Sequence, residues 1–191
     1  MILLQLIFAT MLPIVDIEAN SIIGSSVLIN HQLVLTAAHV ASTRVLARCG
    51  DKDIEANPIA YDADLDVSVL SLVTPCYLTV SRLASSNALK GSEVRGTGCP
   101  RRHCDWLVIG HVVAYDYTPS STGVQRLTLI SDAPIWMGNS GGPLFDDRGE
   151  ITGIASQIIR FDGPDGMFRL FAVYVPIESI LTFMRQIPGA M

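Results

Sequence analysis

Charged side chains are scarce in this sequence: they make up 16% of its 191 residues, and 13 Lys and Arg stand against 18 Asp and Glu. The net charge of -5 provides no broad positive field that would attract a phosphate backbone. The one basic cluster, at Arg101, Arg102 and His103, is short and typical of a solvated loop. The composition therefore argues against nucleic acid as the main partner.

A long apolar run is also lacking. The N-terminal segment up to Val15 is apolar but shorter than the ~20 residues that a membrane-spanning helix needs, and Pro13 interrupts it. A secretory signal would have a positive start, whereas the first basic residue here is Arg44. We therefore expect no strong membrane anchor and leave the compartment open, with an extracytoplasmic location as one alternative. In the competing interpretation, residues 13–19 alternate apolar and polar side chains and form a first strand.

Cysteine is rare as well, since the chain has four, at Cys49, Cys76, Cys99 and Cys104. These are too few and too scattered to build a disulfide scaffold in a chain of this length. Cys99 and Cys104 are close enough to close a small loop, or to bind a metal together with His103, but a ligand directly beside another gives poor tetrahedral geometry. We expect free or paired loop thiols, no metal site and no cofactor.

Short runs rich in Val, Ile, Leu and Thr recur along the chain, separated by Gly, Pro, Asn, Asp and Ser. This pattern is typical of an all-β protein. A small, polar stretch at residues 84–91 indicates a connection between two β lobes. The apolar residues after Pro176 recur at spacings of three and four, which predicts a C-terminal helix at residues 176–187. We expect strands at residues 26–30, 33–36, 44–49, 67–73, 106–115, 124–131, 150–159 and 168–175.

A serine among glycines is the sharpest feature, since residues 138–144 read GNSGGPL. A serine hydroxyl attacks a carbonyl efficiently when backbone N–H donors are aimed at the developing oxyanion, and a tight turn can supply them. Gly138 tolerates unusual backbone angles, so the N–H groups of Gly138 and Ser140 can converge as an oxyanion hole. By itself the motif also fits a β-turn with a surface serine.

Two further segments contain groups that would activate such a serine. Residues 36–39 read TAAH and place His39 at the end of an apolar strand. Residues 62–70 read DADLDVSVL, in which acidic side chains lead directly into a buried strand. A carboxylate at the mouth of a strand can fix the tautomer of a neighbouring imidazole. Asp66 adjoins the apolar run and is our choice, with Asp64 on the same strand face as the alternative.

The three segments occur in the order His, Asp, Ser and resemble the three signatures of trypsin-like serine peptidases. The closest likeness is to the HtrA branch of that family. The resemblance covers roughly residues 24 to 187, and it extends to residues 131–135, 149–154 and 172–177. It implies an all-β fold of two six-stranded antiparallel β-barrels of the chymotrypsin/trypsin type, followed by a helix. The active site would lie in the crevice between the barrels.

The resemblance also implies how the chain is divided. Residues 1–191 would form a single peptidase domain. Within it, the first barrel would occupy about residues 13–84 and the second about residues 90–175, and the helix about residues 176–187. HtrA proteins commonly carry a peptide-binding PDZ module after the protease, and this sequence ends before one would begin.

The expected activity is that of a serine endopeptidase, which hydrolyses polypeptide substrates through an acyl-enzyme. Ser140 would be the nucleophile, His39 the general base and Asp66 the group that orients the histidine. The oxyanion hole would be formed by Gly138 and Ser140. Two alternatives stay open: a catalytically weak or inactive peptide-binding module on the same fold, and an esterase or acyltransferase with the same triad. The α/β-hydrolases, however, order their triad Ser, Asp, His.

Activation by proteolysis is not implied. The digestive branch of the family usually has Asp before the serine, where it pairs with a newly released N-terminus, and this chain has Asn139. The cysteine that follows the catalytic histidine in that branch is Val40 here, so the disulfides of the branch cannot be transferred. The sequence does not indicate an oligomeric state.

The specificity pocket lacks the acid that would select Lys or Arg, because Pro134 occupies the position six residues before Ser140. We expect cleavage after small or aliphatic residues. The strand that would line this pocket would also pair with the substrate backbone. By resemblance, the substrate-binding residues would be Ile135, Ile154, Ala155, Ser156 and Gln157, of which Gln157 fits an apolar wall poorly.

Overall fold

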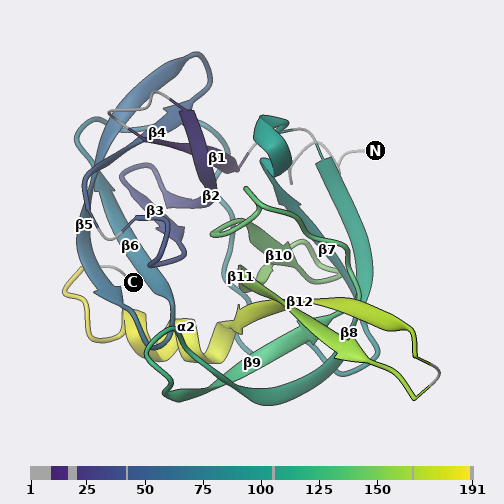
Figure 1. Cartoon of the computed structure of the whole chain (residues 1–191). Coiled ribbons are helices and arrows are strands. Elements are labelled where there is room, and N and C mark those ends of the chain that lie inside the picture. Colours follow the sequence, from purple (N-terminus) through teal and green to yellow (C-terminus); the bar gives the residue numbers. More distant parts are fainter. Residues whose placement is uncertain (1–9, 17–20, 42, 105, 165, 190–191) are drawn as a thin grey trace.

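The structure, a computed structural model, describes residues 10–16, 21–41, 43–104, 106–164 and 166–189. Strands dominate these residues, and an α-helix follows them near the C-terminus (Figure 1). The first strands are β1 (Met11–Asp16), β2 (Ser21–Asn30), β3 (Leu33–Thr36), β4 (Val45–Cys49), β5 (Lys52–Asp62) and β6 (Val67–Leu72). After them come β7 (Glu93–Gly98), the 3-10 helix η1 (Pro100–Arg102), β8 (Trp106–Pro119), β9 (Gln125–Ser131), β10 (Pro143–Phe145), β11 (Ile151–Asp162), β12 (Phe168–Pro176) and helix α2 (Ile177–Met184).

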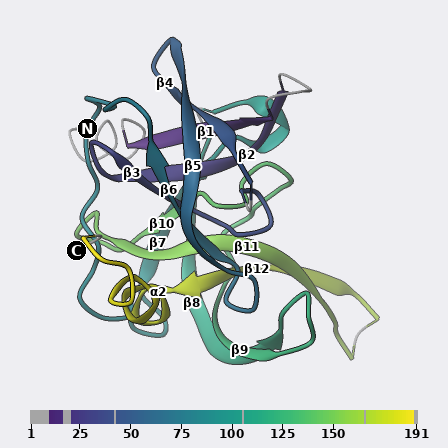
Figure 2. The same ribbon diagram turned by 90° about the vertical axis from the view of Figure 1, so that its left-hand side faces the viewer.

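The strands form two closed barrels, in the orders β1-β2-β3-β6-β5-β4 and β10-β11-β12-β9-β8-β7. Neighbouring strands run antiparallel in both barrels. The barrels lie side by side, and α2 lies beside the second one (Figures 1 and 2). The predicted all-β fold of two six-stranded barrels with a C-terminal helix is confirmed.

The sequence patterns locate every described strand except β5, β7 and β10. In β5, charged side chains and Pro58 hide the alternation, and a bulge between Pro58 and Ala60 shifts the register against β6. In β7, Gly96 and Gly98 supply no side chains to a pattern, and β10 has just three residues. Of the first strand expected at residues 13–19, residues 13–16 belong to β1 and the rest lie outside the described residues.

Three apolar clusters form the core, one inside each barrel and one that joins the barrels. The joining cluster combines Leu35 and Val69 of the first barrel with Ile154 and Val175 of the second. Each fully buried aliphatic side chain contributes roughly 1.5–3 kcal/mol, so this cluster fixes the barrels relative to each other. Helix α2 begins after Pro176, as expected, ends three residues before the expected residue 187, and adds four buried side chains: Ile177, Ile180, Phe183 and Met184.

Both cysteine pairs form disulfides, Cys49–Cys76 and Cys99–Cys104. The pairing of Cys99 with Cys104 was one of the options that the sequence left open. The other bond joins the end of β4 to the segment after β6, across a separation of 27 residues. Because Cys76 is fully buried in the core of the first barrel, this bond both closes a long loop and fills the core.

We expect the Cys49→Ala, Cys76→Ala double variant to lower the free energy of unfolding by about 3–4 kcal/mol, because the loop entropy of the unfolded chain is regained. The Cys99–Cys104 bond closes a much shorter loop, of sequence separation 5, so the Cys99→Ala, Cys104→Ala variant should lose about 2 kcal/mol. Denaturant unfolding under non-reducing conditions measures both values. The reverse order of the two losses would contradict this prediction.

No helix within the described ranges is long and apolar enough to cross a membrane. Residues 1–9, where a signal sequence would begin, lie outside the described residues. The end of that apolar segment, Met11–Asp16, is strand β1, which pairs with β2 and with β4 in the first barrel. This pairing agrees with the interpretation of the segment as a strand of the folded body.

Candidate active site

His39 lies in a tight turn that follows β3. The N–H groups of Val40 and Ala41 donate to the carbonyl of Ala37 at 3.1 and 3.3 Å, which closes the turn. Ala37 and Ala38 are buried, and their small side chains allow this turn to pack against the barrel. The imidazole is thereby placed at the mouth of the barrel, where 49% of its side chain is exposed.

Asp66 immediately precedes β6 and faces His39 across the same end of the first barrel. Its carboxylate oxygens lie 2.9 and 3.0 Å from His39 Nδ1, and Oδ1 also accepts the main-chain N–H of His39 at 3.1 Å. An ionised carboxylate only accepts hydrogen bonds, so Nδ1 carries a proton, and in the neutral imidazole Nε2 is then the accepting nitrogen. Asp66 adopts a left-handed backbone angle, φ 63°, which is uncommon for a residue other than glycine.

The carboxylate of Asp66 is 12% exposed and is supported from the second barrel. Ser156 Oγ donates to Asp66 Oδ2 at 2.5 Å, and Arg126 Nη1 lies 3.9 Å from the same oxygen. Burial alone would raise the pKa of Asp66, but the hydrogen bonds from His39 and Ser156 outweigh it and hold that pKa below its ordinary value. The group is therefore ionised at neutral pH.

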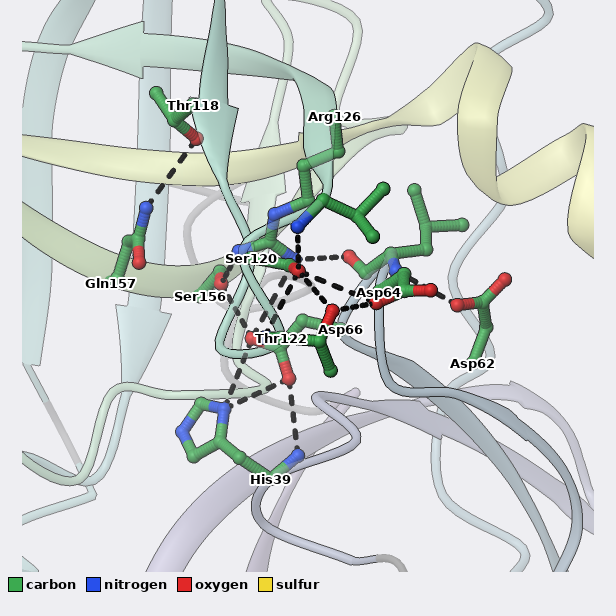
Figure 3. A network of polar contacts seen from close by, with 12 residues as sticks. His39, Asp62, Asp64, Asp66, Thr118, Ser120, Thr122, Arg126, Ser156 and Gln157 are labelled. Atoms are coloured by element: carbon green, nitrogen blue, oxygen red, sulfur yellow. Dashed lines mark hydrogen bonds and ion pairs between the residues drawn. The ribbon is translucent and has the colours of Figure 1, made fainter.

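The side chain of Asp64, the alternative acid, forms its hydrogen bonds with the turn between β8 and β9 and not with His39. Its Oδ1 accepts hydrogen bonds from the hydroxyls of Ser120 and Thr122, in the turn between β8 and β9 (Figure 3). Asp62 accepts the main-chain N–H of Leu65 at 2.8 Å and so shapes the loop that leads to β6. Of the three acids in this loop, Asp66 is the one that the structure brings to His39.

Ser140 lies in the loop before β10, which reaches from the second barrel to the first. Gly141 has φ 82°, and a Cβ atom at this position would collide with Thr36 Oγ1 and the carbonyl oxygen of Ser25. The N–H of Ser25 also donates to the carbonyl of Ser140 at 2.8 Å. The nucleophile candidate is thus fixed against the end of β3, three residues before His39.

His39 Nε2 and Ser140 Oγ form no hydrogen bond to each other or to another group of the described chain. Such contacts are often long in an unliganded site and tighten when the substrate binds. Both groups are therefore available for a reaction partner.

Hydrogen bonds from Ser25 and Arg101 hold the turn that precedes Ser140. Ser25 Oγ donates to the carbonyl of Gly138 at 2.8 Å and accepts the N–H of Cys99 at 2.9 Å. The N–H of Arg101 donates to the carbonyl of Met137 at 3.1 Å. In a trans peptide the N–H points opposite to the carbonyl, so the N–H of Gly138 is directed away from Arg101. Gly138 has φ 100°, an angle that glycine adopts without strain.

Asn139 occupies the position at which an acid would pair with a released N-terminus. It is buried, and its N–H donates to the carbonyl of Trp136 at 3.0 Å, which holds the turn by a local contact. Ile22 lies within β2 and pairs with Val15 of β1. The turn and the strand therefore each have their own contacts within the folded chain.

The expected substrate-binding residues lie in different environments. Ile135 packs against the core of the second barrel, which includes Ala155, whereas Ile154 is fully buried between the barrels. Ser156 sits at a bulge in β11, between Ala155 and Gln157, which turns its hydroxyl toward Asp66. Gln157 lines a pocket of about 300 Å³ together with His39, Asp66, Ser120, Ser121, Arg126 and Ser156.

Sequence reasoning missed two residues that support the site, Ser25 and Arg126. Ser25 is a polar residue just before the expected strand at residues 26–30, and no neighbouring residue indicates that it supports a distant turn. The sequence does contain an indication for Arg126, because it lies two residues from Thr128 in an apolar run and so on the same face of the strand. In the structure both residues are buried. A cation at an inward-facing position of a strand requires a partner inside the fold.

A family model described as the trypsin-like peptidase domain matches residues 24–154. A probable periplasmic serine endoprotease, DegP-like, from Pseudomonas putida (strain GB-1) is 31% identical over 175 residues, which cover 89% of this chain and 35% of that protein. The chloroplastic protease Do-like 2 from Arabidopsis thaliana is 30% identical over 182 residues, which cover 85% of this chain and 28% of that protein. The chain thus spans about a third of the length of these curated relatives.

Solved structures share the fold. The HtrA-type protease AlgW, solved with a tripeptide, has a TM-score of 0.82 at 21% identity, with 98% of this chain and 62% of that chain covered. The active form of the Rv3671c protease from M. tuberculosis has a TM-score of 0.78 at 20% identity, with 97% and 84% covered. The family match spans the His39, Asp66 and Ser140 segments and extends into both barrels, and the chain therefore belongs to the trypsin-like peptidase domain family, with HtrA-like relatives.

Proposed function

We propose that the protein is a serine endopeptidase in which Ser140 is the nucleophile, His39 the general base and Asp66 the group that orients the base. The observation that carries the proposal is the contact of both Asp66 oxygens with His39 Nδ1, at 2.9 and 3.0 Å, beside a fixed serine turn. In the neutral imidazole this contact places the proton on Nδ1, so that Nε2 is the acceptor at the mouth of the barrel. A histidine in that state can remove the proton of a serine hydroxyl.

In the proposed reaction, Ser140 Oγ attacks the carbonyl carbon of the scissile peptide bond while His39 Nε2 takes the hydroxyl proton. Asp66 stabilises the imidazolium that results, and the N–H groups of Gly138 and Ser140 donate to the oxyanion. The imidazolium then gives its proton to the leaving amine, which yields the acyl-enzyme. Water, activated by the same histidine, hydrolyses the ester and regenerates Ser140.

We further propose that the whole chain acts as one peptidase domain on polypeptide substrates outside the cytoplasm. The name of the Pseudomonas putida relative includes the word periplasmic. Two disulfides also fit an oxidising compartment. The main-chain groups of Ala155 bond to Gly141 and Gly142, and beyond Ala155 the edge of β11 opposite β12 has no strand partner within the described residues. This edge would accept the substrate backbone as an added strand.

We expect the enzyme to cleave after small or aliphatic residues such as Ala, Val or Leu. Pro134 is uncharged at the position where a pocket for Lys or Arg would have an acid, and its neighbour Ile135 packs against an apolar cluster that includes Ala155 and Ala172. A peptide library, read by mass spectrometry of the products, measures the preference. Dominant cleavage after Lys or Arg would contradict the assignment of the pocket.

The test of the proposed function is covalent labelling of the full chain with a fluorophosphonate probe, followed by peptide mapping and by an assay on casein. Labelling at Ser140 together with casein cleavage supports the endopeptidase. Peptide binding without labelling would identify an inactive peptide-binding module instead. Labelling with ester hydrolysis but without peptide cleavage would favour an esterase.

A further inference from the structure

We propose that Arg126 is a positioning residue of the acid–base pair: from the second barrel it fixes the hydroxyl of Ser156 and the backbone before Asp66, and it reduces the negative charge that Asp66 presents to His39. The inference rests on the proposed function, since His39 and Asp66 are its subject. It assigns a task to a buried cation that the reaction itself does not use.

Arg126 extends from β9 of the second barrel into the loop of the first barrel that ends at Asp66 (Figure 3). Its side chain is 6% exposed. Nη1 donates to the carbonyl of Leu65, and Nη2 donates to Ser156 Oγ at 2.7 Å. The contact with Leu65 lies directly before the left-handed backbone of Asp66, so Arg126 restrains the chain next to a strained residue.

The contact with Ser156 also sets the direction of a proton. A guanidinium group can only donate, so Ser156 Oγ accepts from Arg126 and its own hydroxyl proton is free for another acceptor. That acceptor is Asp66 Oδ2, at 2.5 Å. Arg126 thereby makes Ser156 a donor to the carboxylate, and this bond holds the carboxylate plane in the orientation in which both oxygens face His39.

The charge of Arg126 acts on the same carboxylate. Nη1 lies 3.9 Å from Asp66 Oδ2 in a region that little water reaches, where charges interact more strongly than at the surface. Burial lowers the pKa of Arg126, while Asp66 and Asp62 oppose that change, and an arginine stays charged in any case. A cation behind Asp66 opposes the negative potential that the carboxylate produces at His39.

The other charged groups that face Arg126 are acidic. Together with Arg126, one crevice of about 450 Å³ is lined by Asp62 at the end of β5, Asp64 in the loop that follows, and Glu178 of α2. The negative charges of these three groups add to that of Asp66 in the surroundings of His39. Arg126 is the cation that they share, so its loss leaves their effect on the imidazole unopposed.

A purely structural connection between the barrels would not need a buried guanidinium. Arg126 Nε is buried without a hydrogen-bond partner in the described chain, which is a cost that an apolar side chain of similar size would avoid. The two hydrogen bonds that Arg126 does form converge on the residues that hold Asp66, namely Leu65 and Ser156. The arrangement therefore serves the carboxylate rather than the packing alone.

The test compares Arg126→Gln, which removes the charge but keeps a donor for Leu65, with Arg126→Lys, which keeps the charge. NMR titration of the imidazole of His39, in a Ser140→Ala background that prevents autolysis, reads the effect without any need for activity. We expect Arg126→Gln to raise the titration midpoint of His39 by about one pH unit and Arg126→Lys to leave it nearly unchanged. His31, His103 and His111 serve as internal controls.

In the protein that retains Ser140, Arg126→Lys should lower kcat on a peptide about tenfold with KM unchanged. The reason is that a lysine cannot keep both guanidinium hydrogen bonds, to the Leu65 carbonyl and to Ser156 Oγ. A folded Arg126→Gln variant with an unshifted His39, or equal shifts in both variants, would overturn the inference. If Arg126→Gln does not fold, wild-type kcat in Arg126→Lys overturns it. Failure of the proposed function would appear separately, as a wild-type chain that neither labels nor cleaves.

Discussion

Replacement of Ser140 by alanine should abolish covalent labelling and lower kcat for peptide cleavage by about 10⁵–10⁶-fold, because the acyl-enzyme can no longer form. The residual rate would come from water attack within the oxyanion turn. Single-turnover assays with a fluorogenic peptide, together with labelling by a fluorophosphonate, measure both effects. Ser85→Ala, at an exposed position in the connection between the barrels, is the matched control.

The Ser140→Ala variant should keep its fold, so that the loss can be assigned to chemistry. Ser140 Oγ has no hydrogen-bond partner within the described residues, and the contact between Ser25 N–H and the Ser140 carbonyl involves only main-chain atoms. A substitution of this kind usually changes the free energy of unfolding by less than about 0.5 kcal/mol. Undiminished labelling of the variant, at a neighbour such as Ser121, would remove Ser140 from the mechanism.

Most of the fold can be predicted from the sequence, because β-strands have local patterns of apolar and polar residues. Runs such as the one that became β6 alternate or concentrate apolar side chains, and the turn residues between them mark the ends. The sequence pattern does not predict β5, because charged residues and Pro58 interrupt its alternation. Its position comes from its neighbours, since it pairs with both β4 and β6. The pairing of Cys49 with Cys76 cannot be predicted from the sequence for a similar reason. The folded barrel brings the two residues together across 27 residues of chain.

The sequence suggests the three main residues of the candidate site, but it does not suggest the contacts that support them. The segments around His39, Asp66 and Ser140 each have a local signature that resembles a known family. Ser156 is an example, since the resemblance implies that it binds substrate and gives no sign of its contact with Asp66. The bulge in β11 directs its hydroxyl to Asp66, 90 residues away in sequence, and no local pattern encodes such a contact.

Asn139 illustrates how the same turn can be supported without an ion pair. A buried charge pair needs both partners, and here the turn is held by a main-chain bond to Trp136 and by the bonds that Ser25 makes to Gly138 and Cys99. Neutral hydrogen bonds of this kind avoid the desolvation of two charges. The support of the turn therefore comes from contacts that are already present in the intact chain.

Replacement of Asp66 by asparagine should lower kcat about 10⁴-fold while the fold persists. The amide of asparagine can place its NH₂ group against His39 Nδ1, which then becomes the acceptor and moves the ring proton to Nε2. An imidazole protonated at Nε2 cannot take the proton of Ser140. The measurement is kcat on a peptide substrate, with fluorophosphonate labelling as a second readout of the nucleophile.

The matched control for this variant is Asp64→Asn, in the same loop. Asp64 accepts hydrogen bonds from Ser120 and Thr122 and makes no contact with His39 in the described structure, so its substitution should change kcat little. The comparison is sensitive because both variants remove one negative charge from the same loop. A larger loss in Asp64→Asn than in Asp66→Asn would mean that the alternative acid orients His39 during the reaction, and the roles of the two residues would have to be exchanged.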